Sequence, residues 1–128
     1  MIAVGVDGSA GGRRALRFAV AEAHRRHCPM LVVHVVPPDA EVEAAKADAR
    51  AEVESAGGLP LPQIEVEVEI SKGDPAEALI EVSERVELLV VGSHATSSLI
   101  HSALGSVSAA CAQLAHCPVV VVPPAAER

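Results

Sequence analysis

The sequence is almost without aromatic residues: it has one Phe and neither Trp nor Tyr. Nucleic-acid-binding proteins use aromatic rings to stack on bases and basic residues to neutralise phosphates. Basic residues are also scarce here, because 10 Lys and Arg stand against 17 Asp and Glu, which gives a formal net charge of −7. We therefore expect no nucleic acid among the partners of this protein.

Long apolar runs and paired cysteines are missing as well. No charge-free run approaches the length that a membrane span needs, so we expect no membrane association. Residue 2 already begins a strand-like run, which argues against a signal peptide. The three cysteines are odd in number and form no CxxC pattern. Together these features predict a cytoplasmic protein in a reducing environment.

The hydrophobic residues that are present account for half of the 128 residues. With a single aromatic ring, the core must consist of Val, Leu, Ile and Ala, which is typical of parallel strands buried under Ala-rich helices. Apolar runs predict five strands, at residues 2–6, 30–36, 63–70, 86–91 and 119–122. Helical periodicity predicts four helices between them: one after Ser9, one over residues 39–56, one capped by Asp74 and one that starts at Ser106, with Val107, Ala110, Cys111 and Leu114 on its buried face.

This alternation predicts an α/β fold in one domain, residues 1–128. We expect a doubly wound five-stranded parallel sheet of order 3-2-1-4-5 with helices on both faces. Residues 63–70 alternate between apolar residues and Glu, as expected of an edge strand with one solvated face. Residues 119–122, at the other edge, are entirely apolar. We predict that residues 118–123 pair with a second copy in a homodimer; the alternative is that the C-terminal tail or a helix covers them.

Doubly wound sheets bind ligands at the carboxyl ends of the strands where the strand order reverses. Here residues 7–9 follow the first strand and residues 92–93 follow the fourth. The small-residue loop over residues 92–106 then leads into a helix N-terminus, which can hold phosphate through backbone N–H groups. Residues 93–116 contain no Lys or Arg, so amides, hydroxyls and imidazoles would have to hold any phosphate.

Six segments between residues 2 and 123 resemble the universal stress proteins. They are Val4-Gly5-Val6-Asp7-Gly8-Ser9, Val33-His34-Val35, Gly73-Asp74-Pro75, Val90-Val91-Gly92-Ser93-His94, Leu104-Gly105-Ser106-Val107 and Cys117-Pro118-Val119-Val120-Val121-Val122. The nucleotide-binding branch of that family carries Gly, two residues, Gly, nine residues, Gly, and then Ser or Thr. Gly92, Gly105 and Ser106 match this pattern, and Ala95 replaces its middle glycine.

The resemblance implies a homodimeric stress-response or signalling protein, not an enzyme, that binds an adenine nucleotide (ATP, ADP or AMP, with or without Mg²⁺). Asp7 and the backbone of Val35 would meet the adenine, and the amides from Gly105 to Val107 would hold phosphate. The residues implied in nucleotide binding are Asp7, Gly8, Ser9, Val35, Val91, Gly92, Ala95, Gly105, Ser106 and Val107.

Two departures weaken the expected phosphate site. Ala95 would cost about 1 kcal/mol if its position requires a positive φ. A missing basic residue would forgo a charge-assisted hydrogen bond of roughly 1.5–3 kcal/mol. Two other functions therefore stay open: a protein-interaction module of the same fold with no nucleotide, and a slow ATPase. The ATPase is disfavoured because residues 93–116 offer no obvious general base.

Simpler roles exist for several of these residues. Asp7 could cap a helix, Gly92 and Gly105 could serve close packing alone, and Ser106 would be a helix N-cap in either case. Three further patterns carry no site. The His24, His27 and Cys28 group lacks a fourth metal ligand, Asp7, Ser9 and His94 lack a nucleophile elbow, and Cys111 fits a small core residue.

Overall fold

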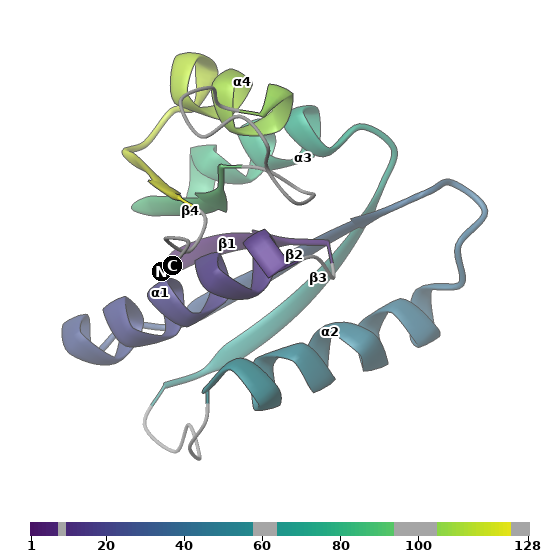
Figure 1. Cartoon of the computed structure of the whole chain (residues 1–128), viewed down its shortest axis with the longest axis horizontal. Coiled ribbons are helices and arrows are strands. Elements are labelled where there is room, and N and C mark those ends of the chain that lie inside the picture. Colours follow the sequence, from purple (N-terminus) through teal and green to yellow (C-terminus); the bar gives the residue numbers. More distant parts are fainter. Residues whose placement is uncertain (8–9, 58–63, 94–104, 124–128) are drawn as a thin grey trace, which may run out of the picture.

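The structure, a computed structural model, describes residues 1–7, 10–57, 64–93 and 105–123. Helices and strands alternate along the chain (Figure 1). In chain order the elements are β1 (Ile2–Val6), α1 (Ala10–Arg26), β2 (Met30–Val36), α2 (Val42–Gly57), β3 (Val66–Lys72), α3 (Pro75–Val82), the 3₁₀ turn η1 (Ser83–Arg85), β4 (Leu88–Gly92), α4 (Ser106–Leu114) and β5 (Val119–Val122).

The five strands form one sheet of order β3-β2-β1-β4-β5, and every neighbouring pair is parallel. Figure 1 shows α1 and α2 on one side of the sheet and α3 and α4 on the other. The predicted α/β class, the strand order 3-2-1-4-5 and the placement of helices on both faces are thus confirmed. The order reverses between β1 and β4, in the middle of the sheet.

Four predicted boundaries, in α2, β3 and β4, are wrong by two or three residues. α2 begins at Val42 rather than at residue 39, because Ala40 N–H donates to Pro37 O (3.0 Å) in a turn that precedes the helix. β3 starts at Val66 and runs to Lys72, since it pairs with β2 along the whole length of that strand. β4 starts at Leu88, two residues later than predicted, because η1 lies immediately before it.

The helix caps confirm one prediction and correct another. Asp74 caps α3: its Oδ2 accepts from Glu77 N–H at 2.9 Å, and Pro75 is the first helical residue. At α4 the N-cap is Gly105, so the prediction that Ser106 is the cap is wrong. The backbone of Gly105 is extended, and its carbonyl already accepts the first helical hydrogen bond from Ala109 N–H (2.9 Å).

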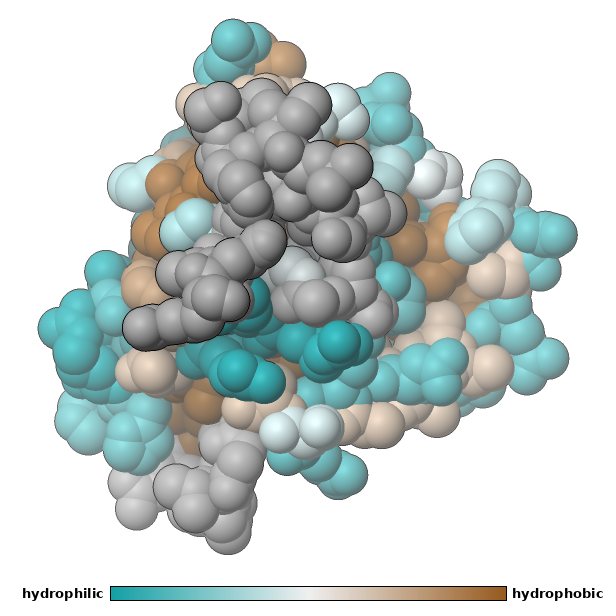
Figure 2. All heavy atoms as spheres, viewed as in Figure 1, coloured by the Kyte–Doolittle hydropathy of each residue, from teal (hydrophilic) through white to brown (hydrophobic). Residues whose placement is uncertain are grey.

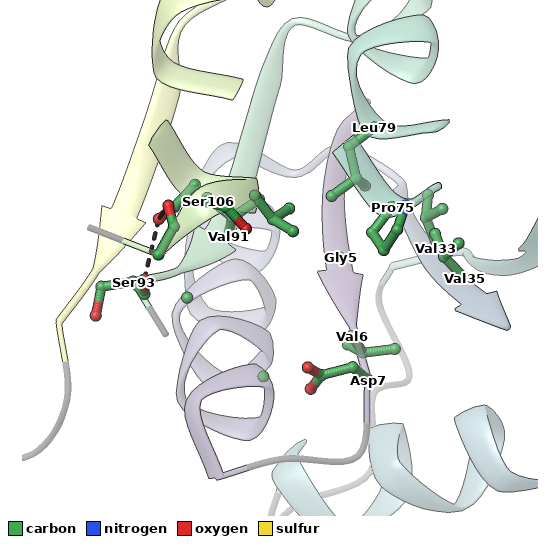
Figure 3. A pocket seen from close by; sticks show the side chains of 15 residues that line it. Gly5, Val6, Asp7, Val33, Val35, Pro75, Leu79, Val91, Ser93 and Ser106 are labelled. Atoms are coloured by element: carbon green, nitrogen blue, oxygen red, sulfur yellow. Dashed lines mark hydrogen bonds between the residues drawn. The ribbon is translucent and has the colours of Figure 1, made fainter. Parts of the chain in front are cut away.

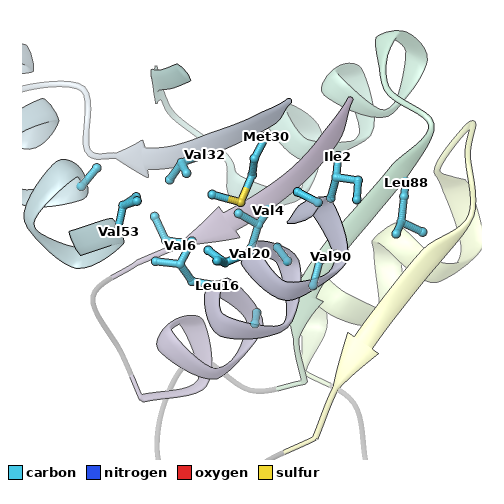
Figure 4. Packing of buried hydrophobic residues seen from close by; sticks show 14 residues of the cluster. Ile2, Val4, Val6, Leu16, Val20, Met30, Val32, Val53, Leu88 and Val90 are labelled. Atoms are coloured by element: carbon cyan, nitrogen blue, oxygen red, sulfur yellow. The ribbon is translucent and has the colours of Figure 1, made fainter. Parts of the chain in front are cut away.

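The two faces of the sheet carry separate hydrophobic clusters. Under α1 and α2, side chains from β1, β2 and β4 pack against Leu16, Val20 and Val53 (Figure 4). Under α3 and α4, Leu79 and Val82 meet alternate residues of the same strands, together with Cys111, which is fully buried as predicted. Because successive residues of a strand point to opposite faces, both clusters draw on every central strand.

Large apolar side chains are exposed at two places in the described residues, Phe18 and Leu114. Leu114 was predicted to share the buried face of α4 but is 59% exposed. It is the last residue of α4, whose buried positions are Ser108 and Cys111. Elsewhere, hydrophilic residues spread over the outer surfaces of α1 and α2 (Figure 2). None of the helices in the described ranges is long and apolar enough to cross a membrane.

Candidate functional site

A cavity of about 340 Å³ lies at the carboxyl ends of the central strands. It adjoins β1 and β4, where the strand order reverses, which is where doubly wound sheets bind ligands. Its described lining comes from β1, β2, β4 and three helices and consists of Gly5, Val6, Asp7, Gly12, Val33, Val35, Pro75, Leu79, Val91, Gly92, Ser93, Gly105, Ser106, Val107 and Ser108.

The cavity has an apolar half and a polar half. Figure 3 shows Val33, Val35, Pro75 and Leu79 gathered around the Gly5 backbone. On the other side of Val91, serines from the end of β4 and from α4 line the wall. A ligand that fits both halves has a flat or apolar part joined to a part that accepts hydrogen bonds.

The apolar half exists because of a glycine on the central strand. A Cβ on Gly5 would lie only 2.9 Å from Cδ1 of Leu79. Leu79 comes from the first turns of α3 and is 3% exposed, so its side chain forms the wall that faces β1. A larger residue at position 5 would push the Leu79 side chain out of this place and change the shape of the cavity.

Position 92 requires glycine for a different structural reason. A Cβ at this position would meet Gly11 O at 2.8 Å and Gly11 C at 3.0 Å, and both atoms belong to the backbone of α1. The alternative of close packing therefore holds for Gly92: it lets α1 approach the end of β4. Gly12, the next residue of α1, lines the cavity wall.

The polar half is built by hydrogen bonds that fix the start of α4 onto the end of β4. Ser93 O accepts from Gly105 N–H (2.7 Å) and from the Ser108 hydroxyl (3.0 Å), and Ser93 N–H donates to Val122 O (3.0 Å). Both serines are buried. The chain is thus anchored on both sides of residues 94–104.

The N–H groups of the first turn of α4 have no acceptor within the helix. They belong to Ser106, Val107 and Ser108, which all line the cavity. The cap residue Gly105 has no side chain that could accept from them. Such a helix start favours an anion or another hydrogen-bond acceptor in the cavity.

Asp7 is the one ionisable side chain in the described lining of the cavity. It follows directly after β1, and its carboxylate is turned toward α1 (Figure 3). A carboxylate only accepts hydrogen bonds, so it would pair with ligand donors such as amino or hydroxyl groups. An exposed carboxylate next to a helix start fits both proposed roles of this residue, ligand contact and helix capping.

Two half-buried polar side chains lie on the opposite face of the sheet, His34 of β2 and Glu52 of α2. His34 Nδ1 on β2 and Glu52 Oε2 on α2 are buried and have no hydrogen-bond partner among the described residues. Burial raises the pKa of Glu52, while the charges of His34 and Arg13 act to lower it and that of Asp7 to raise it. The Glu52 carboxylate is therefore within electrostatic reach of Asp7, which lines the cavity.

Seven of the ten residues predicted for the site line this cavity: Asp7, Val35, Val91, Gly92, Gly105, Ser106 and Val107. Gly8, Ser9 and Ala95 lie outside the described residues. The prediction missed Gly5, Val6, Gly12, Val33, Pro75, Leu79, Ser93 and Ser108. Val33 lies two residues before Val35 on β2 and so points to the same face of the sheet, which the sequence alone could have indicated. The position of the Leu79 side chain, by contrast, depends on how α3 packs against the sheet.

The model of the universal stress protein family matches residues 1–123. This chain belongs to the universal stress protein family. A universal stress protein of Mycobacterium tuberculosis is 33% identical over 132 residues, which cover 94% of this chain and 47% of that protein. This chain spans about half the length of the curated relatives that it matches.

Solved structures of the family have the same fold. The universal stress protein from Archaeoglobus fulgidus in complex with dAMP is 26% identical, has a TM-score of 0.68 and covers 94% of each chain. Another universal stress protein from Archaeoglobus fulgidus is also 26% identical, with a TM-score of 0.72; the match covers 99% of this chain and 45% of that one.

Proposed function

We propose that this chain is an adenine-nucleotide-binding protein that acts as a cytoplasmic homodimer in stress response or signalling. The observation that carries the proposal is the cavity, with its apolar half under β1 and its free helix N–H groups at the other end. An adenine ring suits the first half and sugar hydroxyls or phosphate suit the second. The dAMP complex of a universal stress protein 26% identical to this chain supports the same ligand class.

In this proposal each group has a distinct task. Val33, Val35 and Leu79 enclose the base and exclude water from it. Asp7 accepts hydrogen bonds from amino or hydroxyl groups of the nucleoside. The first-turn amides of α4 hold a phosphate, with the Ser106 hydroxyl beside them.

Binding, rather than turnover, is the proposed role. Asp7 is the sole ionisable group in the described wall, and hydrolysis would need a base placed on the attacking water. No three His, Cys, Asp or Glu side chains of the described residues gather where a metal ion could sit. Any Mg²⁺ would therefore arrive with the phosphates of the nucleotide.

The nucleotide proposal is tested on the purified protein. After denaturation, the supernatant is chromatographed for co-purified nucleotide, and thermal shifts are recorded with adenine nucleotides, with and without Mg²⁺. We expect bound nucleotide or a thermal shift, and Asp7→Ala should reduce both. No bound nucleotide and no shift at millimolar concentrations would instead favour the protein-interaction module. Released ADP that scales with protein and disappears on Asp7→Ala would indicate a slow ATPase.

The homodimer is proposed to form through β5, which is an edge strand. All four of its valines are partly exposed. Pro118 O accepts a hydrogen bond from Leu89 N–H of β4, and Val122 O accepts one from Ser93 N–H, directly after β4. Alternation along the strand therefore turns the backbone groups of Val119 and Val121 outward. An apolar edge with outward donors and acceptors is a template for pairing with another strand.

The dimer is tested by ultracentrifugation of Val121→Pro and Val121→Ala. Both variants lose the valine side chain, but only the proline removes the outward N–H. We expect Val121→Pro to shift the protein toward monomer while Val121→Ala stays largely dimeric. A wild-type protein that sediments as a monomer contradicts the proposal.

A further inference from the structure

The charge distribution around the cavity bears on the number of phosphates that it accepts. Asp7 supplies the only formal charge of the described lining, and that charge is negative. Residues 94–104, which connect Ser93 to Gly105, contain no Lys or Arg in the sequence. The remaining polar groups of the described wall are hydroxyls and backbone amides.

Arg13 and Arg14 follow Gly12 of the cavity wall in the sequence but do not line the cavity themselves. Arg13 follows Gly12 of the cavity wall, and its charge acts on Glu52, on the other face of the sheet. Arg14 Nε donates to Pro123 O at 3.0 Å, beside the edge strand. Neither arginine is among the described residues that line the cavity.

The first turn of α4 offers hydrogen-bond donors for one phosphate group and little more. The three first-turn N–H groups come from adjacent residues, and the Ser108 hydroxyl is already committed to Ser93 O and Gly105 O. Each further phosphate adds negative charge to a cavity whose one described ionisable side chain is a carboxylate, in a chain with a formal net charge of −7. Like charges repel, and this repulsion is stronger near a protein surface than in bulk water.

We propose that the cavity selects adenosine compounds with at most one phosphate group over ATP. The inference rests on the proposed nucleotide-binding function and specifies its ligand class. One phosphate accepts hydrogen bonds from the amides of α4, whereas the second and third find no cation in the described lining, whose one formal charge is negative. The affinity for ATP is therefore no higher than that for AMP. In a site that holds phosphates with Lys or Arg, the affinity would rise with each added phosphate.

The test is a calorimetric titration of the full chain with adenosine, AMP, ADP and ATP, at low and high salt. We expect AMP to bind at least as tightly as ATP. Added salt should raise the affinity for ATP relative to that for AMP, because salt screens the repulsion between the extra phosphates and the negative charge of the protein. ATP binding about tenfold tighter than AMP, and weakened by salt, overturns the inference but leaves the proposed function standing. If neither adenosine nor any nucleotide binds, the proposed function itself is wrong.

A pair of charge variants on α4 sharpens the test. Ser106→Lys places a cation at the cavity end of the helix, and Gln113→Lys places the same charge at its exposed far end. We expect Ser106→Lys to raise the affinity for ATP by about tenfold more than that for AMP, and Gln113→Lys to leave their ratio within about twofold. An unchanged ratio in a folded Ser106→Lys variant contradicts the inference. The salt series on the wild-type chain decides the matter if that variant does not fold.

Discussion

The two faces of the sheet are formed by the same strands but differ in how closely the helices pack on them. Under α1 and α2, the backbone of Gly11 approaches β4 so closely that a Cβ on Gly92 would lie 2.8 Å from Gly11 O. Under α3 and α4, the sheet is covered incompletely and leaves a cavity of about 340 Å³. One face is therefore closely packed, whereas the other has a space that, under the proposed function, a ligand fills.

Leucine truncation on each face should give the largest difference. Leu16 of α1 is fully buried in the filled cluster, so Leu16→Ala leaves a new void and should cost about 2–5 kcal/mol of unfolding free energy. Leu79 already borders the cavity, so Leu79→Ala enlarges an existing space and should lie near the low end of that range. Urea unfolding followed by circular dichroism measures both. Equal losses would contradict the difference between the faces.

Adding a methyl group tests the comparison in the opposite sense. Gly92→Ala collides with the backbone of α1, which cannot yield, and should cost about 1–3 kcal/mol of stability. Gly5→Ala collides with the Leu79 side chain, which can rotate into the cavity. We therefore expect less than about 1 kcal/mol of lost stability but about tenfold weaker AMP binding. If the Gly5→Ala variant binds AMP as tightly as the wild type, Leu79 does not form part of the ligand site.

The pH dependence of stability probes the half-buried carboxyl group of Glu52 on α2. Burial raises the pKa of Glu52, so the folded state holds this proton more tightly than the unfolded state. Its favourable contribution is complete below the ordinary pKa of Glu and is lost as the pH rises through the raised value. Glu52→Gln cannot ionise, so its stability relative to wild type should increase from pH 4 to pH 7.

The control for this change is Glu54→Gln, on an exposed position of the same helix. Thermal melts of the three proteins across that pH range give the comparison. A gain from Glu52→Gln that does not vary with pH would reflect only a new hydrogen bond from the glutamine amide to His34. The proposed penalty for burying the carboxylate would then be wrong.

The smallest effect is expected where α1 meets the edge strand. Arg14→Ala removes the exposed hydrogen bond to Pro123 O and should cost about 0.5 kcal/mol. Arg17→Ala, an exposed arginine on the same helix, is the control. Chemical denaturation resolves the difference. A loss above about 2 kcal/mol from Arg14→Ala would mean that this contact, rather than burial, holds β5 in the sheet.

Much of the architecture could be predicted from the sequence. Apolar runs separated by amphipathic helices imply a parallel sheet, and the resemblance supplied the family. The convergence of Asp7, Gly92 and Gly105 also followed, because the carboxyl ends of neighbouring parallel strands lie together. The Asp74 cap followed from local spacing alone, since its partner Glu77 is only three residues away.

What could not be predicted depends on how the elements pack. A helical stripe marks Leu79 as buried, but burial against filled space and burial beside a cavity have the same sequence pattern. In the sequence, Gly5 is an ordinary residue of a predicted strand. Only the structure shows that the Leu79 side chain occupies the space that a Cβ on Gly5 would take. The limits of β3 were missed because they depend on its register with β2.

The proposed function requires that the face of the sheet under α3 and α4 binds an adenine nucleotide. The most direct measurement is an NMR titration of the isotope-labelled chain with AMP. The account predicts saturable shifts of the Gly5 and Val35 amides, which line the cavity, and little change at Ala49, in the filled cluster on the other face. The absence of saturable shifts at Gly5 and Val35 with millimolar AMP would contradict it.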